Sequence, residues 1–242
     1  MNYMAILGLV WGINLFTPAR TRVGFDRLVE LVTFIVQESE KHFTKTQVKK
    51  IVWTMKLSAE WHQGFYRKDD LTPYIVHPLE VVETLFRLGI YDFMLVISAI
   101  LHDVVEDEAN KDKRYRKRTI ISCNLGYTVR ETVELVTKSR EPWRRKLFFF
   151  YLIKQKKPYV AWRGQALKLV DAETNARTYS VFVPEKRREK IDENYREYPA
   201  VAKRLDQLLK ERVRKGELKS NPYERLAELL LRHLYETLAH YR

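Results

Sequence analysis

The dipeptide His102-Asp103 lies near the end of an apolar stretch, residues 93–105. An imidazole nitrogen and a carboxylate oxygen are suitable ligands for Mn²⁺, Fe²⁺ or Zn²⁺. A single pair of this kind also arises by chance, and a buried histidine is more often a hydrogen-bonded core residue than a metal ligand. The pair therefore indicates a metal site only if other parts of the chain supply further ligands.

Two such residues stand elsewhere in the sequence. His77 directly precedes Pro78, which suits the first turn of a helix, so the imidazole is free to point away from the helix axis. Asp171 follows the apolar residues Leu169 and Val170, where an unpaired carboxylate would be costly to bury. From separate helices, four side chains could then hold one ion and leave positions open for water and substrate. The predicted ligands are His77, His102, Asp103 and Asp171.

Further polar residues surround these ligands. Glu106 and Asp107 add two carboxylates just after the His-Asp pair, and their mutual repulsion needs a positive charge to offset it. Asn175 and Thr178 lie four and seven residues after Asp171, on the same face of a helix.

Several strings occur in the order found in RelA/SpoT-type guanosine tetraphosphate hydrolase domains, which the chain resembles over roughly residues 45 to 205. The string His-Asp-Val-Val-Glu-Asp together with Tyr-Ile-Val-His-Pro is highly specific. The matching strings are His62 to Gly64, Arg67-Lys68, Pro73 to Leu79, His102 to Asp107, Val136 to Lys138, Lys168 to Asp171 and Asn175 to Thr178.

This resemblance implies roles for individual residues. The four predicted ligands correspond to residues that usually hold Mn²⁺, although Zn²⁺, Fe²⁺ or Mg²⁺ would also suit them. Glu106 and Asp107 correspond to the acids that orient and deprotonate the attacking water. Water would attack the 3′-phosphorus of ppGpp or pppGpp, which releases pyrophosphate and leaves GDP or GTP. The implied nucleotide contacts are Arg67 and Lys68 on the base and ribose side, and Lys138, Asn175, Arg177 and Thr178 around the phosphates.

The chain also departs from the family pattern. Residues 69–72 form a turn one residue longer than usual, Phe65 replaces a glutamine, and Ala172-Glu173-Thr174 replaces Arg-Leu-His. The segment from Glu108 to Thr119 is longer and more basic than expected. Since these segments supply base and phosphate contacts, two alternatives stay open. One is an HD-type phosphohydrolase of NADPH, a dNTP or a cyclic nucleotide, and the other is a catalytically idle module that binds RNA or a protein.

The elements that must position these residues are expected to be helices, because glycine and proline number only 8 each among 242 residues. We predict an all-α HD-domain bundle with additional N- and C-terminal helices, divided into residues 1–44, 45–205 and 206–242. The predicted helices start at Asp26, Thr44 or Thr46, Pro78, Asp92, Tyr127, Tyr159, Pro184 and the Asn221-Pro222 pair, with a charged loop at 108–118 and a helix stop at Pro199.

Composition adds predictions about partners and location. The formal net charge of +13 favours anionic partners, but the basic run 111–118 is more easily explained as a solvated loop than as a nucleic-acid site. A guanine nucleotide alarmone is the expected partner. DNA is not expected, RNA or another anionic partner is left open, and the sequence does not indicate an oligomeric state. About forty residues follow the resemblance, too few for a synthetase domain, so we expect a stand-alone hydrolase.

Three smaller features complete the expectations. The apolar run from Met4 to Phe16 is shorter than the roughly 20 residues of a spanning helix, which favours a cytoplasmic protein and leaves membrane association or export open. The single cysteine, Cys123, excludes an internal disulfide and is expected to be buried. The aromatic run 147–153 is expected in the core, and His62 is expected to be a structural residue at a helix end.

Overall fold

The computed structural model describes residues 3–16, 20–69, 71–106 and 108–241. Within these ranges the regular structure is helical, and extended pairing is limited to one isolated bridge between Tyr66 and Pro73. The predicted all-α fold is therefore confirmed. The chain forms two compact units, an N-terminal unit of Met1–Leu125 and a C-terminal unit of Gly126–Arg242.

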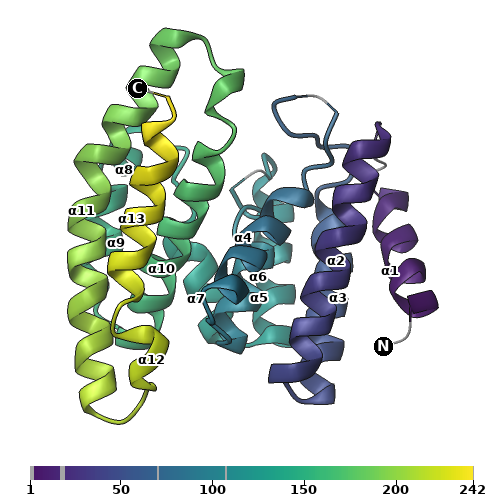
Figure 1. The fold of residues 1–242 in the computed structure, drawn as a ribbon, viewed down its shortest axis with the longest axis horizontal. Coiled ribbons are helices and arrows are strands. Elements are labelled where there is room, and N and C mark those ends of the chain that lie inside the picture. Colours follow the sequence, from purple (N-terminus) through teal and green to yellow (C-terminus); the bar gives the residue numbers. More distant parts are fainter. Residues whose placement is uncertain (1–2, 17–19, 70, 107, 242) are drawn as a thin grey trace. The chain divides into compact units, whose positions relative to one another are not determined.

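In the part of the chain that the structure describes, the N-terminal unit consists of six helices (Figure 1). Helix α2 packs against α4, α4 packs against α5, and α3 is covered by α1 and α5. The helices are α1 (Tyr3–Phe16), α2 (Arg22–His42), α3 (Lys45–Trp61), α4 (Val76–Arg87), α5 (Phe93–Leu101) and α6 (Lys111–Leu125).

Side-chain caps explain where several of these helices begin. Thr44 and Gln47 form a reciprocal capping box at the start of α3, one of the two predicted starts. Asp92 caps α5 by accepting a hydrogen bond from the Leu95 amide at 2.8 Å, as predicted. Helix α2, however, is capped by Thr21 and begins four residues before the predicted Asp26.

Helix α5 is the centre of the N-terminal unit. Its residues from Leu95 to Leu101 are all buried, which matches its apolar composition. The hydroxyl of Ser58 on α3 donates to the Ile100 carbonyl at 2.8 Å and ties the two helices together. The helix ends at Leu101, earlier than predicted, so that His102 is its C-cap and residues 103–106 form a turn.

The charged segment 108–118 was predicted to be a loop, and this was wrong. Residues from Lys111 onward form helix α6, whose first turn is capped by the Asn110 side chain through the amides of Asp112 and Lys113. Three of the six basic side chains, Lys111, Lys113 and Arg116, are exposed and two are half-buried, whereas Lys117 is buried. The charge run is thus the solvated face of a helix, which hydrophobic periodicity could not reveal because so few apolar residues mark the opposite face.

The C-terminal unit is built around α10, which packs against α7, α11 and α13 (Figure 1). Fifteen of its residues, including Asp171, are buried. The elements are α7 (Tyr127–Val136), α8 (Pro142–Lys146), α9 (Phe148–Lys154), α10 (Pro158–Ala176), the 3₁₀ turn η1 (Tyr179–Val181), α11 (Pro184–Arg214), α12 (Ser220–Tyr223) and α13 (Leu226–Ala239).

Pro199 was predicted to end a helix, but α11 continues through it to Arg214. A proline inside a helix removes one hydrogen bond and costs about 3 kcal/mol. Buried residues on both sides, Tyr198 before it and Val201 and Leu205 after it, anchor the helix against its neighbours and outweigh this cost. The predicted domain limits at 44 and 205 stay predictions; α11 is continuous across residue 205, and the two compact units divide between Leu125 and Gly126.

Three further expectations needed correction. In the run 147–153, Phe148 and Leu152 are buried, but Phe150 and Tyr151 are exposed, because the segment forms the amphipathic helix α9. Cys123 is exposed on α6. The final helix starts at Leu226, after the short α12 that contains the Asn221-Pro222 pair.

The apolar N-terminal segment forms α1, which has 14 residues. In the part of the chain that the structure describes, no helix combines the length and the apolar character needed to cross a bilayer. The cytoplasmic location stays a prediction.

Candidate metal centre

His102 has its tautomer set by the helix that carries it. Its Nδ1 lies 2.8 Å from the Ala99 carbonyl oxygen, so Nδ1–H donates this bond in the neutral ring. The lone pair is then on Nε2, the nitrogen that faces Asp103. Metal-binding histidines are commonly oriented by a second hydrogen bond of this kind.

His77 and Asp103 complete a compact group of donors with His102. Asp103 Oδ2 lies 3.1 Å from His102 Nε2 and 3.6 Å from His77 Nε2. Ring nitrogens of the two histidines approach within 4.8 Å. Donors about 2.1 Å from one ion at angles of 90–120° lie about 3.0–3.6 Å apart. The two separations between Asp103 and the histidines therefore fit a divalent metal, and His77 and His102 are almost fully buried.

Tyr74 is a candidate positioning residue that the sequence did not single out. Its hydroxyl donates a 2.8 Å hydrogen bond to Asp103 Oδ2, the same oxygen that lies between the two imidazoles. This bond fixes the rotamer of the carboxylate and stabilises its negative charge. Tyr74 stood inside the specific string before His77, but its hydroxyl could not be assigned a partner without coordinates.

His62 lies at the C-terminal end of α3, as expected of a structural residue, and is 1% exposed. Its ring packs against that of Tyr74 in a tilted arrangement, with a centroid distance of 4.7 Å and an interplanar angle of 31°. Burial lowers the pKa of His62 to about 3; Asp103 opposes this shift, while Lys117 and the other two histidines reinforce it. The imidazole is therefore neutral at physiological pH.

The turn after Asp103 carries the predicted catalytic acids. Glu106 is half-buried, and Asp107 lies outside the described residues. Lys117 reaches this turn from α6, where its ammonium group donates to the Val104 carbonyl at 3.0 Å and pairs with Glu108 at 3.3 Å. The basic helix α6 thus contributes a buried cation that holds the ends of the turn on either side of Glu106.

The two predicted base-side residues, Arg67 and Lys68, lie in the loop between α3 and α4. Arg67 is buried, with its guanidinium 6.0 Å from the centre of the Tyr74 ring, and Lys68 is exposed. The longer turn that follows is closed by Asp69, which accepts hydrogen bonds from the Leu71 and Thr72 amides. Partial burial opposes ionisation of Asp69, but these bonds and that of the Thr72 hydroxyl lower its pKa.

Asp171 belongs to the C-terminal unit and is held there by two side chains of its own helix. Lys168 Nζ lies 2.5 Å from Oδ2, and Asn175 Nδ2 donates to Oδ1 at 2.6 Å. The sequence reasoning expected a cation beside this carboxylate but did not identify Lys168 as one. Its position, one turn before Asp171, was the available signal.

The remaining predicted nucleotide contacts also lie in the C-terminal unit. Lys138 lines a cavity of about 560 Å³ and lies 3.9 Å from Glu193. Arg177 is exposed and pairs with Glu173 at 2.7 Å, and the Thr178 hydroxyl donates to the Asn175 carbonyl. The structure thus groups Asn175 directly with Asp171, whereas Arg177 is engaged by another acid.

The helical fold and the His-His-Asp cluster define an HD-type phosphohydrolase class. No family model matches the sequence. The chain is 33% identical over 139 residues to the Xenopus tropicalis protein named guanosine-3′,5′-bis(diphosphate) 3′-pyrophosphohydrolase MESH1, covering 56% of this chain and 72% of that one. The human protein of the same name is 29% identical over 158 residues, covering 64% and 83%. The chain belongs to this pyrophosphohydrolase family.

Two further proteins are similar to this chain over part of a sequence or in fold. A Streptomyces coelicolor protein named GTP pyrophosphokinase is 27% identical over 184 residues, but the chain spans only 21% of its length. A solved structure described as a metazoan ortholog of SpoT that hydrolyzes ppGpp has a TM-score of 0.53 and 22% identity, covering 77% of this chain and 94% of that one. The structural likeness supports the fold.

Proposed function

We propose that the protein is a metal-dependent 3′-pyrophosphohydrolase of ppGpp and pppGpp, which releases pyrophosphate and leaves GDP or GTP. The observation that carries this proposal is the placement of Asp103 Oδ2 at 3.1 and 3.6 Å from Nε2 of His102 and His77. The substrate of the proposal is inferred from the names of the two vertebrate relatives.

The proposed ligands are His77, His102, Asp103 and Asp171, with Mn²⁺ as the metal and Zn²⁺, Fe²⁺ or Mg²⁺ as alternatives. A divalent ion bound there supplies an acidified water and neutralises charge on the phosphoryl group. Tyr74 keeps the Asp103 carboxylate turned toward the imidazoles. Lys168 and Asn175 keep the Asp171 carboxylate in a fixed orientation.

Glu106 is proposed to accept the proton of the attacking water, with Asp107 as a second acid that helps to orient it. The half-buried position of Glu106, two residues after the lysine-bound carbonyl of Val104, supports this role.

The nucleotide is proposed to contact Arg67 and Lys68 with its base and ribose. Arg67 is suited to this role because its planar guanidinium is already held next to an aromatic ring, at little further entropic cost. The phosphates are proposed to meet Lys138, Asn175, Arg177 and Thr178. Arg177 would have to exchange its ion pair with Glu173 for a phosphate, whereas Asn175 would contribute through its hold on Asp171.

The test is pyrophosphate release from ppGpp by protein stripped with a chelator and reloaded with Mn²⁺. Activity should require the metal and should fall by at least about a hundredfold in Asp103→Asn and Glu106→Gln. Asp112→Asn, which removes an exposed acid from α6, is the matched control and should retain activity. Absence of turnover by the metal-loaded wild-type protein would overturn the proposal.

The same assay separates the alternative functions. Faster hydrolysis of NADPH, a dNTP or a cyclic nucleotide than of ppGpp would keep the metal centre and replace the substrate. Salt-sensitive RNA binding that survives Asp103→Asn, without turnover of any nucleotide, would indicate the catalytically idle module.

A further inference from the structure

Helix α1 exposes an apolar surface without any charged residue. Between Tyr3 and Phe16 the sequence contains no Asp, Glu, Lys, Arg or His. One face of the helix, with Leu9, Val10 and Ile13, is buried against the rest of the N-terminal unit. The opposite face presents Trp11 and Leu15, which are 59% and 79% exposed. The solvent side of a surface helix is normally polar, so this face indicates contact with something other than water.

The apolar surface continues beyond α1. Val23, in the first turn of α2, is 78% exposed. Phe25, two residues further along α2, has its ring centroid 5.3 Å from that of Trp11 and so connects the two helices. The exposed apolar side chains therefore come from two successive helices rather than from one isolated position.

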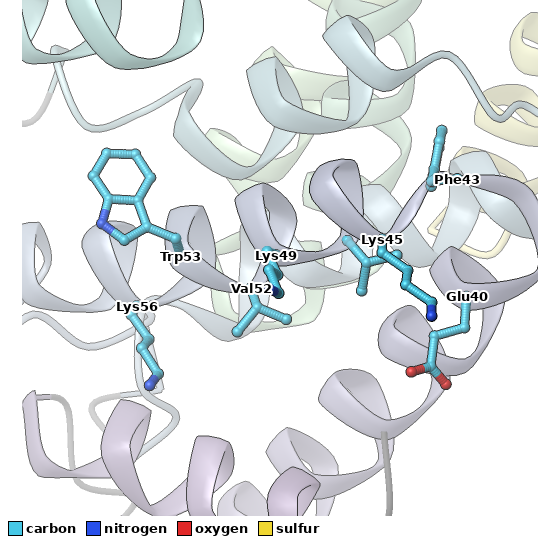
Figure 2. Close-up of a pocket in the computed structure, with 8 residues that line it drawn as sticks. Glu40, Phe43, Lys45, Lys49, Val52, Trp53 and Lys56 are labelled. Carbon is cyan, nitrogen blue, oxygen red and sulfur yellow. The ribbon is translucent and has the colours of Figure 1, made fainter.

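Beside α1, helix α3 offers an apolar groove edged with positive charge. The groove has a volume of about 620 Å³, with walls from Phe43, Val48, Val52 and Trp53. Three lysines spaced along the helix stand at its edge, with Glu40 as the acid that also lines it (Figure 2). These lysines are Lys45, Lys49 and Lys56, and all three are exposed.

The lysine edge and the apolar helix adjoin each other. Helix α1 packs against α3, and a β-carbon built on Gly12 would lie 4.0 Å from Cε of Lys56. Gly12 follows Trp11 directly, so the methylene chain of Lys56 borders the exposed apolar face of α1. The long lysine stems can cover apolar surface while their ammonium groups reach outward.

We propose that this surface, formed by α1 and the lysine edge of α3, binds the interface of an anionic lipid bilayer. A tryptophan, aliphatic side chains and several lysines on neighbouring helices are the combination that suits the boundary between headgroups and acyl chains. Since no described helix is able to span a bilayer, the protein would lie on the membrane surface.

A bilayer fits this surface better than an acidic peptide helix does. A bound helix would fill the groove of α3 but would leave Trp11 and Leu15 exposed, because neither residue lines that groove. A deformable lipid interface covers a convex helix and a groove beside it together. Glu40 at the groove and the exposed Glu60 at the end of α3 reduce the positive charge without reversing it.

The experiment is sedimentation of the full chain with vesicles of phosphatidylcholine alone and of phosphatidylcholine mixed with phosphatidylserine. Binding should require the anionic lipid and weaken with salt. Each lysine near such a surface contributes about fivefold in affinity, so changing all three to glutamine should weaken binding by about a hundredfold. The altered residues are Lys45, Lys49 and Lys56. The double variant Trp11→Ser, Leu15→Ser should also lose binding.

A matched control removes the same charge from α6, by changing Lys111, Lys113 and Arg116, all exposed, to glutamine. This control should bind vesicles nearly as the wild type does, apart from the loss of net charge. Equal loss in both triple variants would show a general charge effect and overturn the proposal, as would equal binding to purely zwitterionic vesicles. Tryptophan quenching by brominated lipid that weakens in Trp11→Phe would support it independently; part of the quenching should remain, because Trp53 lines the groove of the same surface. Binding of an acidic peptide or RNA without vesicle binding would contradict it.

Discussion

Stability of the metal-free protein should fall between pH 7 and pH 5 because of one buried imidazole. His62 is 1% exposed at the end of α3, between the Tyr74 ring and a surrounding group of ionisable side chains. Those that influence its pKa are Asp103, Lys117, His77 and His102. Burial, the largest influence, lowers its pKa from 6.5 to about 3.

The size of the effect follows from proton linkage. In the unfolded chain His62 takes up a proton below its pKa of 6.5, whereas the folded protein keeps it neutral down to about pH 3. The unfolded state binds more protons in this window, so stability is fully present above pH 6.5 and is lost as the pH falls toward 3. At pH 5, about 1.5 units below 6.5, the loss amounts to about 2 kcal/mol at 1.36 kcal/mol per unit.

The assay is urea unfolding followed by circular dichroism, with a chelator present so that metal binding does not enter. Wild type is compared with His62→Phe, which preserves a ring beside Tyr74, and with His62→Gln. Other titrating groups contribute equally to each protein. The stability gap between wild type and either variant should therefore shift by about 2 kcal/mol from pH 7 to pH 5. If the gap stays constant, His62 is not held neutral and the reasoning from burial fails.

Three substitutions test other contacts. Tyr74→Phe, which removes the hydroxyl bonded to Asp103, should lower Mn²⁺ affinity by about tenfold in calorimetry while helicity is kept; unchanged affinity would contradict the positioning role. Lys117→Met should lower the free energy of unfolding by about 1.5–3 kcal/mol, since a buried charged donor is lost, and a neutral effect in urea titration would refute this. A β-carbon on Gly164 would lie 2.6 Å from Leu135 Cδ2, so Gly164→Ala should destabilise the wild type by about 1 kcal/mol. In the Leu135→Ala background the clash is absent, and the higher helix propensity of alanine should stabilise the protein by about as much. A double-mutant cycle measures both effects. The same sign in both backgrounds would exclude this contact.

Strong local patterns allowed much of the fold to be predicted from the sequence. Asp92 before an unbroken apolar run predicted the start of the central helix α5, because a capping side chain and burial on all sides leave few other structures open. Thr44 was one of the two predicted starts of α3, and the structure shows that it forms a capping box with Gln47 there. Helix α6 was missed since its stabilising features, the Asn110 cap and one buried lysine, leave no periodic apolar signal.

The candidate site was predictable as a set of residue types but not as a set of contacts. The sequence indicated that His77, His102 and Asp103 could share an ion, and the geometry fits this. It could not indicate that the Tyr74 hydroxyl bonds to the ligand oxygen or that Lys117 reaches back to the turn, because both contacts join residues that are far apart along the chain or face each other only after folding. Pro199 was misjudged for a related reason, since tertiary packing outweighed its local preference.

The two carboxylates proposed as ligands differ in their surroundings, and this difference bears on how a metal would bind. Asp103 Oδ2 is close to a hydroxyl and two imidazoles, groups that are neutral when they serve as ligands. Asp171 has the ammonium group of Lys168 at 2.5 Å. An ammonium group stabilises a buried carboxylate more than neutral donors do. We therefore expect a bound divalent ion to add more electrostatic stabilisation at Asp103 than at Asp171, whose carboxylate already has a cation beside it.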